Sequence, residues 1–265
     1  MNEKRFEGKV VFVSGGSSGL GKRTAKDFAK EGTKVILFDK DAENGNKVQK
    51  EITKEGGEAI YIEGDVREKS SVEDGVEKAF QKFGTVDFLI NSAGILQDGM
   101  IHKLPEEKWN NVIDTNLKGC FLCLQACATR WIKAAKAEKK EEIKDYPDKR
   151  VVSISSQAAE GNIGQINYSA SKAGLIGMTK TAAMELIRYN VKVHSVMPTL
   201  IDTPILGELL SKQDGKWRKY YSDRIPLGIG QPKHVSDAIR FLCSEESSFT
   251  TGIVLPVNGG RLGKL

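Results

Sequence analysis

Short apolar runs alternate with longer amphipathic segments along almost the whole chain. We predict a strand at each apolar run, over residues 10–13, 35–38, 59–62, 86–90, 151–154, 191–196 and 253–257. The intervening segments show helical spacing and predict helices over 19–31, 42–55, 70–83, 105–113, 115–137, 168–189 and 232–243. Apolar strands that alternate with helices are typical of a parallel sheet covered on both faces. We therefore predict the α/β class, with residues 1–265 forming one domain around a doubly wound, parallel, seven-stranded sheet.

Two segments interrupt this alternation. Residues 133–149 are rich in Lys and Glu, and we expect them to extend a helix into solvent before a turn at Pro147; a partner-binding segment is the alternative. Residues 203–226 mix Leu, Trp and Tyr with Lys and Arg downstream of the sixth strand. Open α/β sheets bind ligands at the carboxyl ends of their strands, so we interpret 203–226 as a lid over an apolar substrate.

A glycine-rich turn over residues 14–21 joins the first strand to the first helix. Glycine lets the backbone approach a pyrophosphate, and the N-terminus of a helix offers free N–H groups to its charge. Such turns are common, but this position between a strand and a helix is typical of a dinucleotide site. We expect cofactor contacts from Gly15, Ser17, Ser18, Gly19, Leu20 and Gly21.

Asp39 ends the second strand, where an acid is expected in a dinucleotide-binding fold. Its carboxylate can accept hydrogen bonds from both ribose hydroxyls and would repel a 2′-phosphate, which favours NAD over NADP. Lys40 follows directly and favours NADP, while a plain cap of the strand end is the remaining alternative for Asp39. The ends of the third and fourth strands complete the predicted cofactor site with Asp65 (toward the adenine amino group), Val66, Asn91, Ala93 and Gly94.

Tyr168 and Lys172 lie four residues apart at the start of a predicted helix, on one helix face. A nearby ammonium favours the phenolate, so we expect Lys172 to lower the pKa of Tyr168 from its usual value near ~10. A phenol adjusted in this way can exchange a proton with a carbinol. Alone, such a pair is more often two surface neighbours, but here it accompanies a nucleotide-binding turn.

These motifs, taken in order, resemble the classical short-chain dehydrogenase/reductase family from about Lys9 to Gly260. The ordered set is Gly15-x-x-x-Gly19-x-Gly21, Asp65, the run 91–94, Asn116, Ser156 and Tyr168-x-x-x-Lys172. The resemblance implies a Rossmann fold and hydride transfer between a nicotinamide cofactor and an alcohol or ketone. It also places Pro198, Thr199, Ile201 and Thr203 beside the nicotinamide. The chain departs from the family's usual residues at Ser14, Thr199 and Asn258.

The resemblance assigns four catalytic residues. Tyr168 would exchange a proton with the substrate oxygen. Lys172 would lower the pKa of Tyr168 and bind the nicotinamide ribose. Asn116 would hold a water that joins Lys172 to solvent. The serine has two candidates, because the family's usual spacing to the tyrosine selects Ser155, whereas local alignment selects Ser156. We favour Ser156; side chains on consecutive strand residues point to opposite faces, so only one of the two can serve.

Charge and composition bear on three further questions: nucleic-acid binding, location in the cell and metal binding. A net charge of +5 is too mild to argue for nucleic acid. The N-terminal residues do not form a signal peptide, and no apolar run approaches the ~20 residues that span a bilayer, so we expect a cytoplasmic protein. The closely spaced Cys120, Cys123 and Cys127 have no second Cys/His pair to complete a metal site, and we predict no metal.

The substrate is less constrained. Residues 164–177 resemble NADPH-using 3-oxoacyl-carrier-protein reductases, while residues 158–165 and Asp39 resemble NAD-dependent 3-hydroxyacyl-CoA and 17β-hydroxysteroid dehydrogenases, which we favour. Basic residues of the lid could meet the phosphate of an acyl carrier or simply keep the lid soluble. A non-enzymatic dinucleotide sensor is the third alternative. The resemblance also implies a homodimer or homotetramer through 105–135 and 168–188, with Cys120, Leu124, Cys127 and Trp131 either at that interface or in the core.

Overall fold

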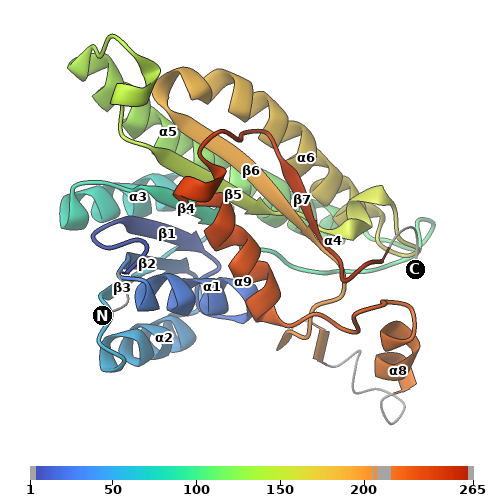
Figure 1. Cartoon of the computed structure of the whole chain (residues 1–265). Helices are drawn as coiled ribbons and strands as arrows, with labels where there is room; N and C mark the ends of the chain where they lie inside the picture. The colour runs from blue at the N-terminus through green and yellow to red at the C-terminus, as the bar shows by residue number, and fades with distance from the viewer. Residues whose placement is uncertain (1–3, 205, 208–215, 262–265) are drawn as a thin grey trace.

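The computed structural model describes residues 4–204, 206–207 and 216–261. Within these residues, seven parallel strands form one sheet in the order β3-β2-β1-β4-β5-β6-β7 (Figure 1). The strands are β1 (Val10–Ser14), β2 (Lys34–Asp39), β3 (Ala59–Glu63), β4 (Phe88–Asn91), β5 (Lys149–Ile154), β6 (Val191–Pro198) and β7 (Val254–Val257). The strand order reverses between β1 and β4, which is where open α/β sheets bind ligands at their carboxyl edge. The predicted α/β class and doubly wound parallel sheet are confirmed.

Helices cover both faces of the sheet (Figure 1). The described helices are α1 (Gly19–Lys30), α2 (Ala42–Lys54), α3 (Lys69–Phe83), α4 (Glu106–Ile113), α5 (Gly119–Glu138), α6 (Ile166–Leu186), α8 (Lys216–Ser222) and α9 (Pro232–Leu242). Apolar residues of α1, α2 and α9 pack on one face, and those of α3, α5 and α6 pack on the other. Alternate strand residues enter the two cores, which explains why the strands are apolar throughout.

The predicted strand at 86–90 starts at Phe88 in the structure. The preceding Asp87 is buried, and its carboxylate accepts hydrogen bonds from the Val10 backbone N–H at 2.9 Å and from Lys149 Nζ at 2.7 Å. A buried carboxylate needs such partners. Asp87 therefore ties the amino ends of β1 and β5 together just before β4 begins.

The cysteine stripe on α5 belongs to the core. Cys120, Cys123 and Cys127 are buried, and burial raises the pKa of the Cys127 thiol to about 12. Trp131 on the same face donates from its indole N–H to Val86 O at 2.8 Å. The stripe thus faces the sheet, and of its two predicted roles the structure selects core packing over an exposed interface.

The charged segment after α5 is mostly solvated, as expected, but it is not one extended helix. The α-helix ends at Glu138, and Lys139 adopts the left-handed conformation at φ 49°. Residues 136–145 are exposed, with a short 3-10 turn at Ile143–Asp145. Lys149, the last residue of the predicted segment 133–149, is instead buried in β5, where its ammonium pairs with the Asp87 carboxylate. The prediction of a solvated segment over 133–149 therefore fails at its C-terminal end.

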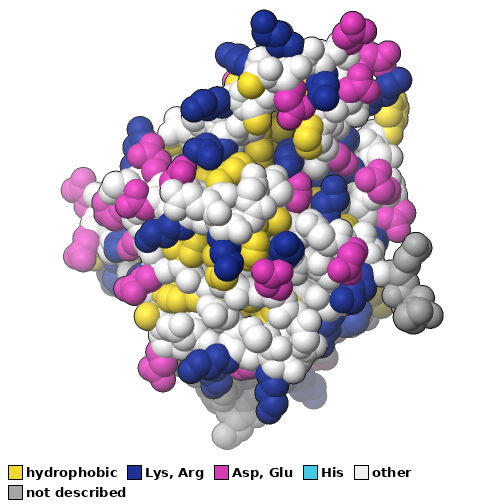
Figure 2. All heavy atoms as spheres, turned by 90° about the vertical axis from the view of Figure 1, so that its left-hand side faces the viewer, with side chains coloured by type: hydrophobic (Ala, Val, Ile, Leu, Met, Phe, Trp, Pro, Cys, Tyr) yellow, Lys and Arg dark blue, Asp and Glu magenta, His cyan; other side chains and the backbone are white. Residues whose placement is uncertain are grey.

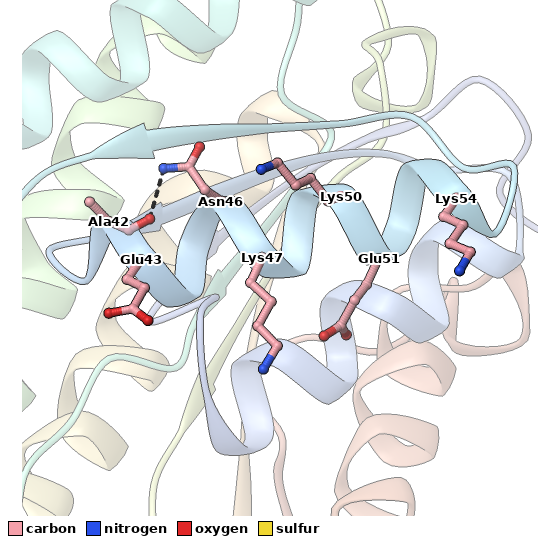
Figure 3. A pocket seen from close by; sticks show the side chains of 7 residues that line it. All are labelled: Ala42, Glu43, Asn46, Lys47, Lys50, Glu51 and Lys54. Carbon is pink, nitrogen blue, oxygen red and sulfur yellow. Dashed lines mark hydrogen bonds between the residues drawn. The ribbon is translucent and has the colours of Figure 1, made fainter.

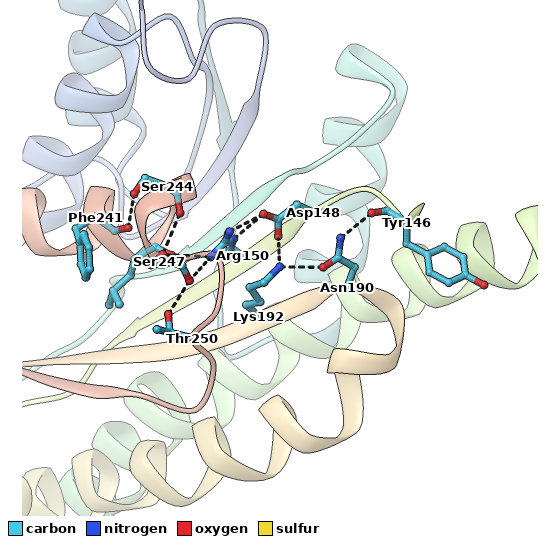
Figure 4. Close-up of polar contacts among 10 residues, drawn as sticks. Tyr146, Asp148, Arg150, Asn190, Lys192, Phe241, Ser244, Ser247 and Thr250 are labelled. Atoms are coloured by element: carbon cyan, nitrogen blue, oxygen red, sulfur yellow. Dashed lines mark hydrogen bonds and ion pairs between the residues drawn. The ribbon is translucent and has the colours of Figure 1, made fainter. Parts of the chain in front are cut away.

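A network of buried polar groups closes the amino edge of β5 and β6 (Figure 4). The fully buried Arg150 donates to Asp148 Oδ2 at 3.0 Å and to Ser247 O at 3.2 Å. Lys192 donates to Asp148 Oδ1 at 3.0 Å and to Asn190 Oδ1 at 2.8 Å. These partners offset the desolvation of two buried cations. The network lies at the opposite edge of the sheet from the carboxyl ends of the strands.

The surface that faces left in Figure 1 carries interspersed acids and bases (Figure 2). Ion pairs also join neighbouring helices: Lys22 and Lys26 of α1 pair with Glu51 of α2 at 3.0 and 3.2 Å. Such mixing agrees with the mild net charge and offers no broad basic surface on this side. None of the helices in the described part of the chain is both long and apolar enough to cross a membrane.

Candidate active site

A cavity of about 360 Å³ opens at the carboxyl edge of the sheet, where the strand order reverses. Its wall draws on the ends of β1 to β5 and on the first turns of α6. A wider hollow of about 700 Å³ follows the outside of α2, but its lining comes from that helix alone (Figure 3). Of these two, the smaller cavity gathers chemically different groups from the ends of several strands and from α6, so we place the active site there.

The glycine-rich turn forms one wall of this cavity. Gly15 has φ 68°, and a Cβ on it would lie 2.7 Å from the Ala93 backbone. A Cβ on Gly21 would lie 2.0 Å from Gly15 O. Larger residues at these two positions would displace the turn, so glycine is required for close backbone packing. Of the predicted turn residues, the structure places Gly15, Ser17, Ser18, Gly19 and Leu20 in the lining, whereas Gly21 supports the turn from behind.

Asp39 is held against this turn. Its Oδ2 accepts a hydrogen bond from Ser17 N at 3.1 Å, and its Oδ1 accepts one from Asp41 N at 3.1 Å. Asp41, rather than Asp39, caps α2 by accepting from Asn44 N at 3.0 Å. The Asp39 carboxylate therefore has a fixed position in the cavity wall, with Lys40 beside it. Together with the glycine turn, this arrangement fits the ribose and pyrophosphate of a dinucleotide.

The end of β3 contributes a charged residue that we did not predict. Asp65, Val66 and Arg67 all line the cavity. The Arg67 guanidinium holds the Asp65 carboxylate, with Nη2 2.6 Å from Oδ2 and Nε 3.1 Å from Oδ1. This pairing lowers the pKa of Asp65 below its usual value. The Asp-x-Arg spacing was the only signal in the sequence that could have indicated Arg67.

The end of β4 is divided between the cavity and the core. Ala93 and Gly94 line the cavity, as do their neighbours Ser92 and Ile95. Asn91 instead lies buried in β4, where its Nδ2 donates to Ser153 Oγ of the adjacent strand at 3.2 Å. The structure therefore brings two of these three predicted residues to the cavity wall, and Asn91 supports them from within the sheet.

Asn116 lies in a π-helical turn, Asp114–Lys118, that connects α4 to α5. Its Oδ1 accepts from Ile95 N at 2.8 Å, and its Nδ2 donates to Ile95 O at 3.0 Å. Single π-turns within helices are common at functional sites. A Cβ on Gly94 would lie 3.4 Å from Asn116 Oδ1 and 3.7 Å from Lys172 Nζ, so the amide and the ammonium both lie next to Gly94. The water relay through Asn116 stays a prediction.

Tyr168 and Lys172 meet in the cavity at the start of α6. Lys172 Nζ lies 5.5 Å from the centroid of the Tyr168 ring and donates to Ile154 O at 2.7 Å. The predicted helix-face pairing is therefore present. The expected fall in the pKa of the phenol is not, because burial raises the pKa of Tyr168 to about 12, and burial also lowers the pKa of Lys172. Desolvation, with a smaller contribution from the Asp98 carboxylate, outweighs the effect of Ser156, so the shift has the opposite sign to the one we expected.

The two candidate serines have different surroundings. Ser155 is buried and donates from its hydroxyl to the backbone carbonyl of Lys172 at 2.9 Å. Ser156 forms a hydrogen bond with Tyr168, which lowers the pKa of that phenol and partly opposes the effect of burial. Its Oγ also accepts from Ala158 N at 3.2 Å. The structure thus places Ser156 beside the phenol and uses Ser155 to fasten α6 to the end of β5.

The end of β6 is only partly in the cavity. Thr203 lines it together with Pro204, whereas Pro198, Thr199 and Ile201 lie outside its lining. Ile201 is buried in the core. Thr199 instead contacts the C-terminal segment, because its Oγ1 accepts from Arg261 Nη1 at 2.9 Å. The nicotinamide contacts expected of Pro198, Thr199 and Ile201 stay predictions.

The predicted lid over 203–226 falls partly outside the described residues, at 205 and 208–215. Its described parts include Thr203 and Pro204 at the cavity and the helix α8. Arg218 of α8 pairs with Asp202 at 2.9 Å, which links this helix to the end of β6. The role of the segment as a lid is untested.

Comparison with known proteins shows the family. The family model described as short chain dehydrogenase matches residues 9–214. The chain is 40% identical over 258 residues to a 3-oxoacyl-[acyl-carrier-protein] reductase from Thermotoga maritima, covering 97% of this chain and 98% of that protein. It is 36% identical over 257 residues to the BbsD subunit of (2S)-[(R)-hydroxy(phenyl)methyl]succinyl-CoA dehydrogenase from Thauera aromatica, covering 97% of each.

Solved structures agree with these relatives. A 3-ketoacyl-(acyl-carrier-protein) reductase from Brucella melitensis, solved in complex with NADH, superposes with a TM-score of 0.85 at 28% identity. The superposition covers 97% of this chain and 99% of that one. The chain therefore belongs to the short-chain dehydrogenase family, and it is an oxidoreductase that acts on CH–OH groups.

Proposed function

We propose that this enzyme transfers a hydride between NAD(H) and the oxygen-bearing carbon of a 3-oxoacyl or 3-hydroxyacyl thioester. The observation that carries the proposal is the contact of Ser156 with Tyr168 beside Lys172, in a cavity that Asp39 also lines. Two similar proteins have names that describe acyl chains carried by a carrier protein or by CoA. A thioester substrate is therefore a better match to these relatives than a hydroxysteroid.

The protein's own groups supply the proton chemistry. A phenol is neutral near neutral pH, and the rise in the pKa of Tyr168 to about 12 keeps it so; this is the form that donates a proton to a carbonyl oxygen in reduction. In oxidation the same oxygen takes the proton back. Because its Oγ already accepts from Ala158 N, the Ser156 hydroxyl can direct its hydrogen toward the substrate oxygen. The bound nicotinamide supplies or accepts the hydride.

Asp39 is the basis for preferring NAD(H). Its carboxylate is oriented by two backbone N–H groups, so it presents fixed acceptors to ribose hydroxyls and a negative charge to a 2′-phosphate. Lys40 lines the same cavity and carries the second candidate function, an NADPH-dependent 3-oxoacyl-[acyl-carrier-protein] reductase. Which residue dominates is decided by comparing the two cofactors directly.

Cofactor binding tests this preference. We expect NADH to bind more tightly than NADPH, as measured by nicotinamide fluorescence. In the Asp39→Ala variant, the ratio of the NADPH to the NADH dissociation constant should fall at least about tenfold, since two hydrogen bonds to a charged group are removed. Glu63→Ala is the matched control, because Glu63 pairs with Asp39 in the sheet register but is exposed and outside the cavity lining. Tighter binding of NADPH than of NADH to the wild type would instead favour the second candidate function, the NADPH-dependent 3-oxoacyl-[acyl-carrier-protein] reductase.

Turnover with a panel of ketones tests the substrate class. We expect 3-oxoacyl-CoA thioesters to be reduced faster than a ketosteroid of similar size, and Tyr168→Phe to lower turnover by about 10²- to 10⁴-fold because it removes the proton donor. Fluorescence titration of NADH with Tyr168→Phe should give wild-type affinity. Equal turnover by wild type and Tyr168→Phe would refute the role of the phenol and revive a dinucleotide-sensing function.

We also propose that the enzyme works as a homodimer or homotetramer. The described helices α4, α5 and α6 expose large apolar side chains, including Trp109, Phe121 and Met184. These residues, and not the buried cysteine stripe, are the ones available for contact with a second copy. Light scattering after gel filtration gives the mass directly, and a monomer at micromolar concentration would contradict the proposal.

A further inference from the structure

Three donors from Arg67 converge on one carboxylate at the end of β3. The backbone N–H of Arg67 donates to Asp65 Oδ1 at 2.9 Å, Nε donates to both Asp65 oxygens, and Nη2 donates to Oδ2 at 2.6 Å. Such a fork of parallel hydrogen bonds fixes the plane of a guanidinium as well as its position. Asp65 is therefore already occupied by Arg67 on both of its oxygens.

The support of this pair is itself rigid. Ser71 Oγ accepts from Asp65 N at 3.0 Å, which ties the loop to the start of α3. A Cβ on Gly64 would lie 2.3 Å from the ring of Phe38, so the backbone before Asp65 packs tightly on the end of β2. The side chain of Arg67 is 37% exposed and that of Asp65 is 22% exposed, so the guanidinium lies at the rim of the cavity. The planar group is thus held at the cavity wall by Asp65 and remains partly exposed.

We propose that the Arg67 guanidinium, oriented by Asp65, is the platform on which the adenine ring of the dinucleotide stacks. This inference rests on the proposed dinucleotide function of the cavity. A guanidinium is planar, weakly hydrated and attracted to the face of an aromatic ring. Asp65 then acts as a positioning residue for Arg67, which replaces our prediction that it serves mainly as an acceptor for the adenine amino group.

Two substitutions separate the planar group from its charge. Arg67→Lys keeps a cation that can pair with Asp65 but removes the plane, and Arg67→Met removes both. We expect both variants to bind ADP-ribose about tenfold more weakly by calorimetry, the size of a stacking contact of this kind. Reduced nicotinamide mononucleotide, which lacks the adenine, should bind to both with wild-type affinity in a fluorescence titration.

Arg130→Met is the matched control. Arg130 is similarly exposed, at 40%, and forms an ion pair with Glu77 at 2.7 Å, but it lies in a surface groove between α3 and α5. We expect its ADP-ribose affinity to equal that of the wild type. If Arg67→Lys binds ADP-ribose as tightly as the wild type, only charge matters and the stacking proposal is overturned. If wild-type protein binds neither ADP-ribose nor the mononucleotide, the proposed function falls and this inference falls with it.

Reduced nicotinamide hypoxanthine dinucleotide distinguishes stacking from recognition of the amino group, because hypoxanthine keeps the ring but lacks that group. Stacking on Arg67 predicts that wild-type affinity for this analogue stays within about threefold of that for NADH, and that Arg67→Met weakens both dinucleotides by the same factor. A loss of about tenfold for the hypoxanthine analogue in wild-type protein would return the main role to Asp65 as an acceptor and refute the platform.

Discussion

At the scale of single residues, burial sets the direction of the pKa shifts of Tyr168 and Lys172. Lys172 lies 5.5 Å from the Tyr168 ring centroid, yet desolvation raises the pKa of the phenol to about 12. The hydrogen bond from Ser156 is the contact that opposes this rise. The phenol is therefore in its protonated form near neutral pH, which is the form that can donate a proton to a carbonyl oxygen.

The two neighbouring serines should fail in different ways when each is replaced by alanine. Ser156→Ala removes a hydroxyl beside the reacting oxygen and should lower kcat by about 10²- to 10³-fold with little change in stability. Ser155→Ala removes the 2.9 Å hydrogen bond that fastens the Lys172 carbonyl to the end of β5 and should cost about 0.5–1.5 kcal/mol of unfolding free energy. Steady-state kinetics and urea unfolding of both variants measure the two effects. The reverse assignment of kcat and stability losses would make Ser155 the catalytic residue.

At the scale of elements, the turn between β1 and α1 works because two glycines touch. A Cβ on Gly21 would lie 2.0 Å from Gly15 O, and Gly15 in turn packs on the backbone at Ala93. This wall is therefore built from backbone contacts within the turn and between the turn and Ala93, which is distant in the sequence. A larger residue at Gly21 in α1 should therefore change the shape of the cavity through these backbone contacts, although it replaces no polar side chain.

Gly21→Ala should accordingly abolish tight NADH binding, because the new methyl group displaces the Gly15 carbonyl and with it the turn. We expect at least about tenfold weaker binding by fluorescence titration and about 1–3 kcal/mol lower stability, typical of overpacking. Gly177→Ala is the control: this glycine is exposed in α6 with open space around its Cβ position. That variant should bind NADH normally and gain up to about 1 kcal/mol from helix propensity. Normal binding by Gly21→Ala would show that the turn tolerates a shift.

At the scale of the whole molecule, the carboxyl and amino edges of the sheet carry different structures. The carboxyl edge forms the cavity, and the amino edge carries the buried network around Arg150 and Lys192 (Figure 4). His194 of β6 is fully buried next to this network, near Arg150, Lys192 and Asp148. Burial and the two cations lower the pKa of His194 to about 4.

This histidine should make folding sensitive to acid. Its folded pKa lies below its unfolded value, so its contribution to stability is present above about pH 6.5 and is lost as the pH falls toward 4, by up to roughly 3 kcal/mol. We expect His194→Leu to lose less unfolding free energy than the wild type between about pH 7 and about pH 5 in urea titrations. His102→Leu, at an exposed histidine, should behave as the wild type. Equal acid sensitivity of His194→Leu and wild type would assign the effect to other groups.

Much of the fold could be predicted because its signals are local. Apolar strands and amphipathic helices repeat in a simple order, and the ends of most elements differ from the prediction by one or two residues. The glycine turn and the Tyr168–Lys172 pair are contiguous motifs whose geometry follows from one turn and one helix face. The local sequence by itself therefore determined the α/β class, the location of the glycine-rich turn and the placement of Tyr168 and Lys172 on one helix face.

What only the tertiary structure decided depends on groups that are distant in the sequence or on the removal of water. Packing of α6 against the end of β5 turned Ser155 to the Lys172 carbonyl and Ser156 to Tyr168. Packing also buried the cysteine stripe, while the fold of the loop after β3 gave the Asp65 carboxylate to Arg67. The sign of the pKa shift of Tyr168 was decided in the same way, because desolvation is a property of everything packed around a group and not of its neighbours in the chain.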